Sequence, residues 1–255
     1  MDRRPQRLLA AAAALAAAGA GYYYWQTHGT AETPAPAPVQ APAAGDARIE
    51  HPLAPVGGAP LPPLADSDGA LGAAIAALVH ASTLPDLFYP DRLARRWVAT
   101  IDNLPREQVA VEVRAMRPPG GPLATRGEDE ALTIAPDNSV RYAPYMALLA
   151  AVDVGQAAAL YRRFYPLLQE AYEELGYPGK YFNDRLIAVI DHLLATPDVA
   201  EPIRLTHPSV MYRFADPKLE SLSAGQKALL RIGRENAAEV KKKLRALRAE
   251  IARPA

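Results

Sequence analysis

The spacing of hydrophobic and polar positions divides the chain into three parts. Residues 8–25 form an apolar run without a charged side chain, and residues 26–63 are rich in Pro, Ala and Gly. Beyond this linker, apolar residues mostly recur three or four positions apart, which is the spacing of an amphipathic helix. The pattern therefore predicts an apolar N-terminal helix, a linker, and one mainly helical domain over residues 64–251, followed by a tail at 252–255.

Caps and prolines set the expected boundaries of the helices. Asp153 with Gln156, and Ser223 with Gln226, have capping-box spacing and predict two helix starts. Pro166 predicts a kink or an end in the helix that follows Asp153. The apolar stripes of the expected helices are Leu71, Ile75 and Leu78; Leu93, Trp97 and Ile101; Leu160 and Phe164; Leu186, Ile190, Leu193 and Leu194; and Val240, Leu244, Leu247 and Ile251.

Short strands are expected in two places where the helical spacing breaks. Between residues 109 and 134, a Pro- and Gly-rich stretch at residues 117–122 and two short apolar runs predict a loop and a weak hairpin. Ile203–Leu205 and Val210–Phe214 predict a second pair of short strands. The expected fold class is therefore mainly α, a compact multi-helix domain with one or two short β-hairpins, preceded by a transmembrane helix and a disordered linker.

The N-terminal apolar run has the features of a transmembrane signal anchor. Three arginines precede it, and its 18 residues at about 1.5 Å each span about 27 Å, close to the hydrocarbon thickness. Tyrosines and a tryptophan end it, as is favoured at a membrane interface. The positive-inside rule keeps residues 1–7 in the cytoplasm, which predicts an inner-membrane, single-pass protein with its C-terminal domain in the periplasm. The alternative is a signal peptide cleaved near Ala18-Gly19-Ala20.

Residues 26–63 form the expected disordered linker. From residue 27 to residue 63, 22 of 37 positions are Pro, Ala or Gly. Such a segment cannot bury enough apolar surface to offset its ordering entropy, and its prolines favour an extended conformation. At about 3.1 Å per residue its reach is at most about 110 Å. A ligand role for its PxxP sequences is the alternative.

Composition and charge exclude several functional classes. The 255 residues contain no cysteine, which excludes disulfides, thiolate nucleophiles and Cys-ligated metal centres. Basic and acidic residues number 28 each, so no nucleic-acid partner is expected. Residues 166–201 hold seven acids and two bases (−5), whereas residues 223–255 hold nine bases and three acids (+6). The final helix is therefore amphipathic and basic, and its alternative docking surfaces are the acidic segment, another subunit and an anionic envelope surface.

The helix expected from Asn183 or Asp184 to Ala195 carries the main catalytic candidates. Asp184 and Asp191 lie two helical turns apart, so both carboxylates can face one cleft as acid and base, or as ligands of a hard cation. The alternative is a structural role, with Asp184 at the helix N-terminus and Asp191 in solvent. Asp102 is the third catalytic candidate.

The ligand-binding candidates are polar and aromatic residues suited to stacking on, or hydrogen-bonding to, a sugar or peptide. Eight of the twelve tyrosines lie between residues 142 and 212, where packing between helices is the alternative role. The candidates are Asn103, Arg141, Tyr142, Tyr172, Asn183, Arg185, Gln226 and Lys227.

No metal site and no cofactor are expected. The five histidines form no i, i+4 pair, and none lies in an HExxH sequence. The chain also has no GxSxG, Walker or GxGxxG sequence, so hydrolase-elbow and nucleotide-loop chemistry have no support.

Seven separated runs in the domain combine aromatic, charged and proline residues. They are Trp97–Pro105, Arg141-Tyr142, Tyr165–Pro178, Phe182–Leu186, Asp191–Leu194, Tyr212–Pro217 and Ser223–Lys227. In this order they resemble the bacterial family known as domain of unknown function 3014, over about residues 61–250. The sequence departs from that family at Leu123, where Phe is expected, and at Ser139 and Val140. The resemblance implies a proteobacterial single-pass envelope protein with a proline-rich tether, and it implies no activity.

The sequence favours binding over catalysis. An anchor, a spacer and a domain without a complete catalytic set indicate a membrane-anchored periplasmic binding or scaffolding module for an envelope protein or glycan partner. The alternative is an envelope hydrolase or transferase acting on a glycan or peptide, with Asp184 and Asp191 as acid and base and Asp102 among the residues that position the substrate. The sequence predicts no oligomeric state.

Overall fold

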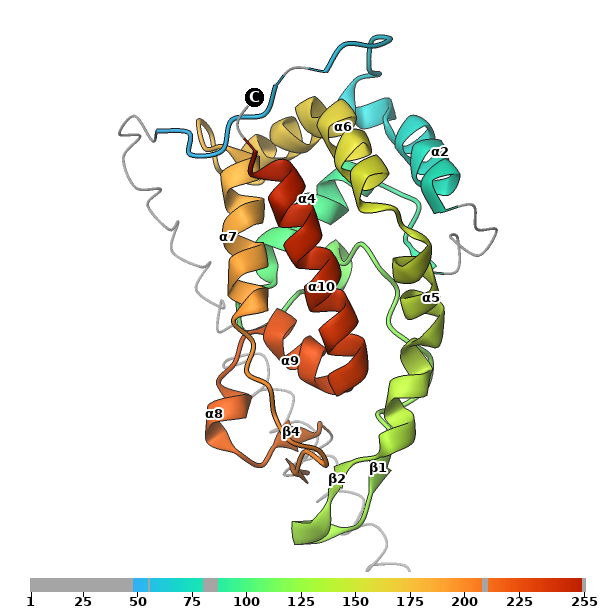
Figure 1. Cartoon of the computed structure of the whole chain (residues 1–255), viewed down its shortest axis with the longest axis vertical. Coiled ribbons are helices and arrows are strands. Elements are labelled where there is room, and N and C mark those ends of the chain that lie inside the picture. The colour runs from blue at the N-terminus through green and yellow to red at the C-terminus, as the bar shows by residue number, and fades with distance from the viewer. Residues whose placement is uncertain (1–47, 55, 80–86, 208–210, 254–255) are drawn as a thin grey trace, which may run out of the picture. The chain divides into compact units, whose positions relative to one another are not determined.

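The computed structural model describes residues 48–54, 56–79, 87–207 and 211–253 (Figure 1). The transmembrane helix expected at residues 8–25 and the first part of the expected linker lie outside these ranges. Among the helices described, no single one is both long and apolar enough to cross a membrane. One bent pair, Pro136–Ala151 with Val154–Glu174 at 82°, meets those requirements of length and composition only when taken together.

The described residues form a mainly helical domain with two small antiparallel sheets, which confirms that part of the expected fold class. The α-helices are α2 (Asp68–Val79), α4 (Leu93–Asn103), α5 (Ala143–Ala151), α6 (Val154–Glu174), α7 (Phe182–Leu194), α8 (Pro217–Glu220), α9 (Ala224–Arg231) and α10 (Arg234–Ile251). The 3-10 helices are η1 (Leu64–Asp66), η2 (Val111–Val113), η3 (Asp129–Ala131) and η4 (Pro136–Tyr142). Strand β1 (Thr125–Arg126) pairs with β2 (Thr133–Ile134), and β3 (Leu205–Thr206) pairs with β4 (Arg213–Phe214).

Helix α10 lies in front of the other helices in the middle of the view and packs against α6 and α7 (Figure 1). The apolar stripe expected on this helix makes the contact. Its Leu244 and Leu247 pack against a buried group that includes Ile187, Ile190 and Ile251. Helix α4 packs against α6 and α7 as well. These contacts fix α7, which carries several of the candidate residues.

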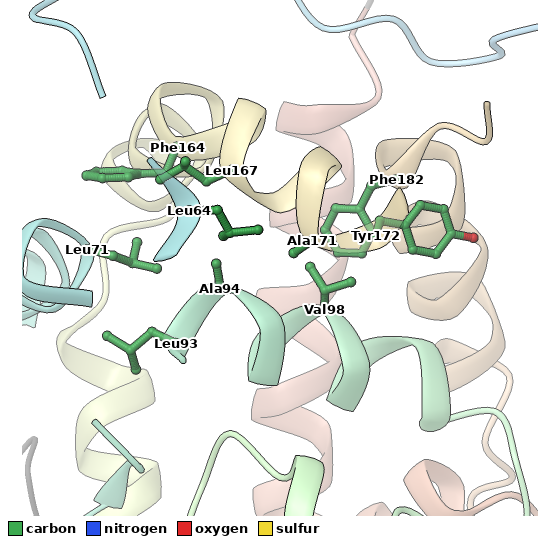
Figure 2. Close-up of a cluster of buried hydrophobic side chains, with 10 residues drawn as sticks. All are labelled: Leu64, Leu71, Leu93, Ala94, Val98, Phe164, Leu167, Ala171, Tyr172 and Phe182. Atoms are coloured by element: carbon green, nitrogen blue, oxygen red, sulfur yellow. The ribbon is translucent and has the colours of Figure 1, made fainter. Parts of the chain in front are cut away.

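A ten-residue hydrophobic cluster joins α4, α6 and the start of α7 (Figure 2). Its members are Leu64, Leu71, Leu93, Ala94, Val98, Phe164, Leu167, Ala171, Tyr172 and Phe182. Val98 and Phe182 are fully buried, and the Tyr172 ring lies 5.3 Å from the Phe182 ring. Burial stabilises the fold by about 1.5–3 kcal/mol for a side chain such as Val or Phe. The cluster therefore holds the three helices in one arrangement.

Helix α6 continues through Pro166, so of the two outcomes expected at this position, a kink or an end, the structure excludes the end. Its N-terminus is capped by Asp153, as expected. Phe164 and Leu167, on either side of the proline, are buried in the ten-residue cluster. This packing offsets the main-chain hydrogen bond that a proline inside a helix removes.

Both expected pairs of short strands are present, and they are joined to each other. The Ile134 N–H donates to Ile203 O (3.0 Å), and the Leu205 N–H donates to Leu132 O (2.8 Å). The second pair is shorter than expected because the main chain at Ile203 bonds the first hairpin instead of β4. The two hairpins therefore pack as one unit, over a cluster that includes Phe214.

The described part of the expected linker has a defined course along the domain. Residues 48–54, termed the strap, run across the ends of α7 and α10 (Figure 1). The compact unit that contains the domain begins before the strap, which differs from the expected start at Leu64. The difference arises from hydrogen bonds between the strap and the start of α7, which local composition does not reveal.

We expect Gly225→Ala to destabilise the domain by about 1–3 kcal/mol, as is usual for overpacking. A Cβ at this position would lie 2.6 Å from Leu193 Cδ2 and 3.1 Å from Leu104 O. Urea unfolding followed by circular dichroism measures the loss. Gly69→Ala in α2 is the control, because a Cβ there meets nothing within 4 Å. An equal loss in both variants would contradict the packing argument.

Candidate functional site

The Asp102 carboxylate is buried at the end of α4 between two arginines. Only 1% of Asp102 is exposed. Arg185 Nε donates to Asp102 Oδ1 (2.8 Å), and Arg185 Nη2 donates to the main-chain oxygen of Asp102 (2.8 Å). Arg106 Nη2 donates to Asp102 Oδ2 (2.8 Å). Two guanidinium groups therefore share one buried carboxylate.

Two tyrosines complete this group. The Tyr177 hydroxyl donates to Asp102 Oδ2 (3.1 Å) and accepts from Arg106 Nη2 (2.9 Å). The Tyr172 ring stacks on Tyr177, with centroids 4.6 Å apart. Burial, followed by the charge of Asp102, raises the pKa of Tyr172 to about 12, so its phenol is protonated at neutral pH. The Asp102 cluster is the name used below for Asp102, Arg106, Tyr172, Tyr177 and Arg185.

The Asp102 cluster joins α4, the turn after α6, and α7. Both oxygens of the carboxylate already accept charge-assisted hydrogen bonds, which occupy the positions that a substrate proton would need. A buried carboxylate is tolerated only when it is paired in this way. The geometry therefore gives Asp102 a role in positioning helices. Solvent reaches the cluster through Arg106, whose side chain is 55% exposed.

Asp184, in the first turn of α7, binds the main chain of the strap. Its Oδ1 accepts the His51 N–H (2.8 Å) and its Oδ2 accepts the Glu50 N–H (3.1 Å). The His51 Nδ1 also lies 3.2 Å from Asp184 Oδ1. Just before the helix, the Tyr181 hydroxyl accepts the Leu53 N–H (2.9 Å).

The Asn183 side chain is fully buried and connects three parts of the chain. Its Nδ2 donates to the main-chain oxygens of His51 (2.8 Å) and Ile251 (3.1 Å). Its Oδ1 accepts from the Tyr161 hydroxyl (3.0 Å). One amide therefore links the strap, α6 and the end of α10.

Polar contacts hold the strap in place. None of the described residues from 48 to 63 is buried, and Ile49 is 47% exposed. A hydrogen bond contributes about 0.5–1.5 kcal/mol net, whereas ordering the backbone of one residue costs about 1–2 kcal/mol. The five hydrogen bonds of the strap therefore only partly offset the cost of ordering its seven residues, and its docking is weak.

Asp191, the second member of the expected carboxylate pair, has a partner of its own. It forms a bidentate ion pair with Arg248 of α10, at 2.5 Å (Nε to Oδ1) and 2.8 Å (Nη2 to Oδ2). The same contact raises the pKa of Arg248. Asp184 and Asp191 lie on one helix as expected, but the structure gives them separate partners rather than one shared cleft. The reason is that the strap covers the first turn of α7, whereas α10 pairs with Asp191 farther along it.

The basic helix α10 docks on the acidic segment, the first of the three surfaces considered for it. Arg234 pairs with Asp198 (2.8 Å), and Lys241 Nζ donates to Thr196 O (2.6 Å). With the Arg248 pair, three basic side chains of this helix bind the acidic segment. The opposite local charges of the sequence therefore compensate each other within the domain.

The remaining candidates have local partners. Asn103 donates to a carbonyl one turn earlier in α4, and Arg141 donates to two carbonyls of the glycine turn before β1. Gln226 completes the capping box of α9, and Lys227 bonds the end of α8. Tyr142 lies beside the Arg141 guanidinium at 5.9 Å. The structure thus brings together five of the eleven candidates. Asp102, Tyr172 and Arg185 lie in the Asp102 cluster, Asn183 and Asp184 lie at the start of α7, and the other six lie outside both groups.

The chain matches the model of a family described as "Protein of unknown function (DUF3014)" over residues 93–248. The chain belongs to this family. The match confirms the resemblance seen in the sequence. It begins at the first residue of α4 and ends in the last turn of α10. No curated protein and no solved structure matches the chain.

The matched DUF3014 segment contains the whole Asp102 cluster and the start of α7, while the strap lies outside it. The family description names no activity.

Two polar contacts in the DUF3014 segment were missed by sequence reasoning. His192 Nε2 lies 2.8 Å from Ser223 Oγ, and the buried Asn138 amide donates to Arg231 O (2.7 Å). The capping-box spacing predicts that Ser223 caps a helix. Nothing in the neighbouring sequence indicates its contact with His192, which lies 31 residues away. The binding of the strap by Asp184 was missed for the same reason.

Two cavities lie in the DUF3014 segment where the hairpins meet the turn between α9 and α10. Their volumes are about 570 Å³ and about 370 Å³. Both are lined by Glu201, Ile203, Leu230 and Arg234, and each has three cationic and two acidic side chains in its lining. None of the candidate residues predicted from sequence lines either cavity. Across the described residues, no group of three or more His, Asp or Glu side chains is placed to hold a metal ion.

We expect Asp102→Ala to lower the free energy of unfolding by about 3 kcal/mol, near the lower end for a broken buried ion pair, because the arginines left behind reach solvent. The urea midpoint measures the change. Asp198→Ala is the matched control, since it also removes a carboxylate from a bidentate arginine pair, but one that is exposed on both sides. An Asp102→Ala effect no larger than the control would contradict the role of the cluster.

Proposed function

We propose that the protein is a membrane-anchored envelope module whose helical domain binds a partner at the end that carries the β-hairpins. A basic flank at residues 1–7 and an uncharged apolar run at residues 8–25 support the anchor. The positive-inside rule then puts the domain in the periplasm. The proline-rich linker suits a domain that works at a distance from the membrane.

The observation that carries the binding role is the separation of the two ends of α10. Its last residue, Ile251, meets the strap through the Asn183 amide. Its first turn lines the larger cavity. The 18 residues of the helix, at about 1.5 Å each, separate these ends by about 27 Å. The strap therefore joins the domain at one end of α10 (Figure 1), and the larger cavity lies at the other end of this helix.

The hairpin end, formed by β1–β4, η4 and the turn between α9 and α10, has the composition of a partner surface. Val140 of η4 is 68% exposed, and Met211 beside β4 is 71% exposed. Arg126 and Arg231 line the larger cavity. Methionine and arginine are enriched in protein interfaces, and exposed apolar side chains mark interaction surfaces. This end therefore supports a partner site better than the candidates chosen from sequence do.

The enzymatic alternative needs Asp184 and Asp191 to act on one substrate as acid and base. Asp184 accepts two strap N–H groups, and Asp191 pairs with Arg248. Asp102 is occupied by two arginines. This distribution of partners favours the binding module over a hydrolase or transferase acting on an envelope glycan or peptide.

A reporter that works only outside the cytoplasm, such as alkaline phosphatase, is expected to be active in cells when fused after Thr30. β-Galactosidase fused at the same position, which works only in the cytoplasm, is expected to be inactive. The reverse pattern would overturn the proposed topology. A mature chain that begins near Gly21 or Tyr22 in mass spectrometry would overturn the anchor and leave export intact.

A photo-crosslinking amino acid at Val140 or Met211 is expected to give one discrete adduct in living cells. The same probe at Leu175 is the control, because that side chain is 40% exposed but lies in the turn between α6 and α7, away from the hairpins. Arg126→Glu is expected to lower the adduct yield about tenfold, equivalent to about 1.4 kcal/mol of binding free energy. Adducts of equal yield from Leu175 would show that the hairpin end is not the partner site.

A further inference from the structure

Three side chains at the start of α7, those of Tyr181, Asn183 and Asp184, form the surface that receives the strap; they are termed the strap site. We propose that the strap site is a binding site for a bent peptide segment and that residues 48–54 of this chain are its reversible ligand. The tether of the domain then has two lengths, one with the strap docked and one with it released.

The strap site recognises main-chain groups. Two successive N–H groups, those of Glu50 and His51, donate to the two oxygens of Asp184. The His51 oxygen accepts from the asparagine amide of the site (2.8 Å), and the Leu53 N–H donates to the tyrosine hydroxyl (2.9 Å). The strap bends at Glu50 and His51, and successive N–H groups in such a turn converge on one anionic group, here the Asp184 carboxylate.

One side chain of the strap adds selectivity. His51 Nδ1 lies 3.2 Å from Asp184 Oδ1, and each of these side chains is 24% exposed. Ile49 is largely in solvent. Pro52, which follows the histidine, restricts the conformations open to His51. The preferred ligand is therefore a bent segment that contains a His-Pro pair.

The strap site keeps its shape when the strap leaves. Asn183 retains its bonds to the Tyr161 hydroxyl and to Ile251 O, and the Tyr181 ring rests 5.3 Å from the Tyr165 ring. A preformed site loses little conformational entropy on binding. The strap itself contributes no buried residue, so it can detach by local opening without unfolding the domain.

Release of the strap changes the reach of the domain. With the strap docked, the expected linker extends only over residues 26–47, about 70 Å at 3.1 Å per residue. Release of the strap adds residues 48–54 and about 22 Å. This consequence rests on the proposed membrane anchor, whereas docking of the strap does not depend on it.

Hydrogen–deuterium exchange on the full chain in detergent tests the docking. The amides of His51 and Leu53 are expected to be protected in the wild type, because both donate to the strap site. Asp184→Ala is expected to speed their exchange by a factor of about ten or more, with the amides of α7 unchanged. Asp191→Ala, on the same helix and without a strap contact, is the matched control and is expected to leave the strap protected.

A change in the strap itself separates docking from folding of the domain. Glu50→Pro removes one N–H that binds Asp184 and touches no buried residue. It is expected to expose the Leu53 amide. A synthetic peptide of residues 48–54 is then expected to bind this variant in nuclear magnetic resonance titrations and to fail with the double variant Glu50→Pro/Asp184→Ala.

Three results would overturn the proposal. They are equal exchange of the strap amides in the wild type and Asp184→Ala, loss of α7 protection together with that of the strap, and no binding of the peptide to Glu50→Pro. The first result would show that Asp184 does not hold the strap. The second would show that the strap is an integral part of the fold. The third would show that the start of α7 does not bind the peptide. Because these measurements are made in detergent on purified chain, a failed topology test would leave them valid.

Discussion

Pairing of the buried Asp102 carboxylate constrains the arrangement of the helices more tightly than apolar contacts do. Hydrophobic clusters tolerate several packings of similar volume, whereas a buried charge needs donors at defined distances. Here the donors come from the segment after α4, the turn after α6, and α7. The two hydrogen bonds from Arg185 to Asp102 fix how α7 is rotated about its own axis. That rotation presents Asp184 to the strap and Asp191 to α10.

The acidic segment at residues 166–201 and the basic segment at residues 223–255 bind each other mainly inside the domain. Helix α10 carries its apolar stripe toward α6 and α7, and three of its basic side chains bind the acidic segment beside that stripe. The zero net charge of the chain therefore reflects internal compensation. Exposed pairs of this kind contribute little free energy each, so the apolar stripe supplies most of the stability and the charges select the orientation of the helix.

Features of the fold that depend on residues close together in the chain can be predicted from the sequence. The spacing of Ser223 and Gln226 predicts a helix start, and the stripe from Val240 to Ile251 predicts a buried face; both are present. The candidate site depends on distant partners. Asp184 meets His51 across 133 positions, so the spacing of carboxylates along α7 suggests a shared cleft that the fold does not build. Tertiary packing likewise decides the course of α6 through Pro166.

The Asn183 amide, which bonds the carbonyls of both His51 and Ile251, brings the two ends of the described domain to one point. The polypeptide is thus nearly a closed ring, with a short gap beside α7. A fold of this kind is suited to insertion into a loop of another protein, and to circular permutation with new ends opened at an exposed turn such as Gly120-Gly121. Insertion would leave the hairpin end free, whereas new ends at Gly120-Gly121 would disturb the contact that Arg141 of η4 makes there.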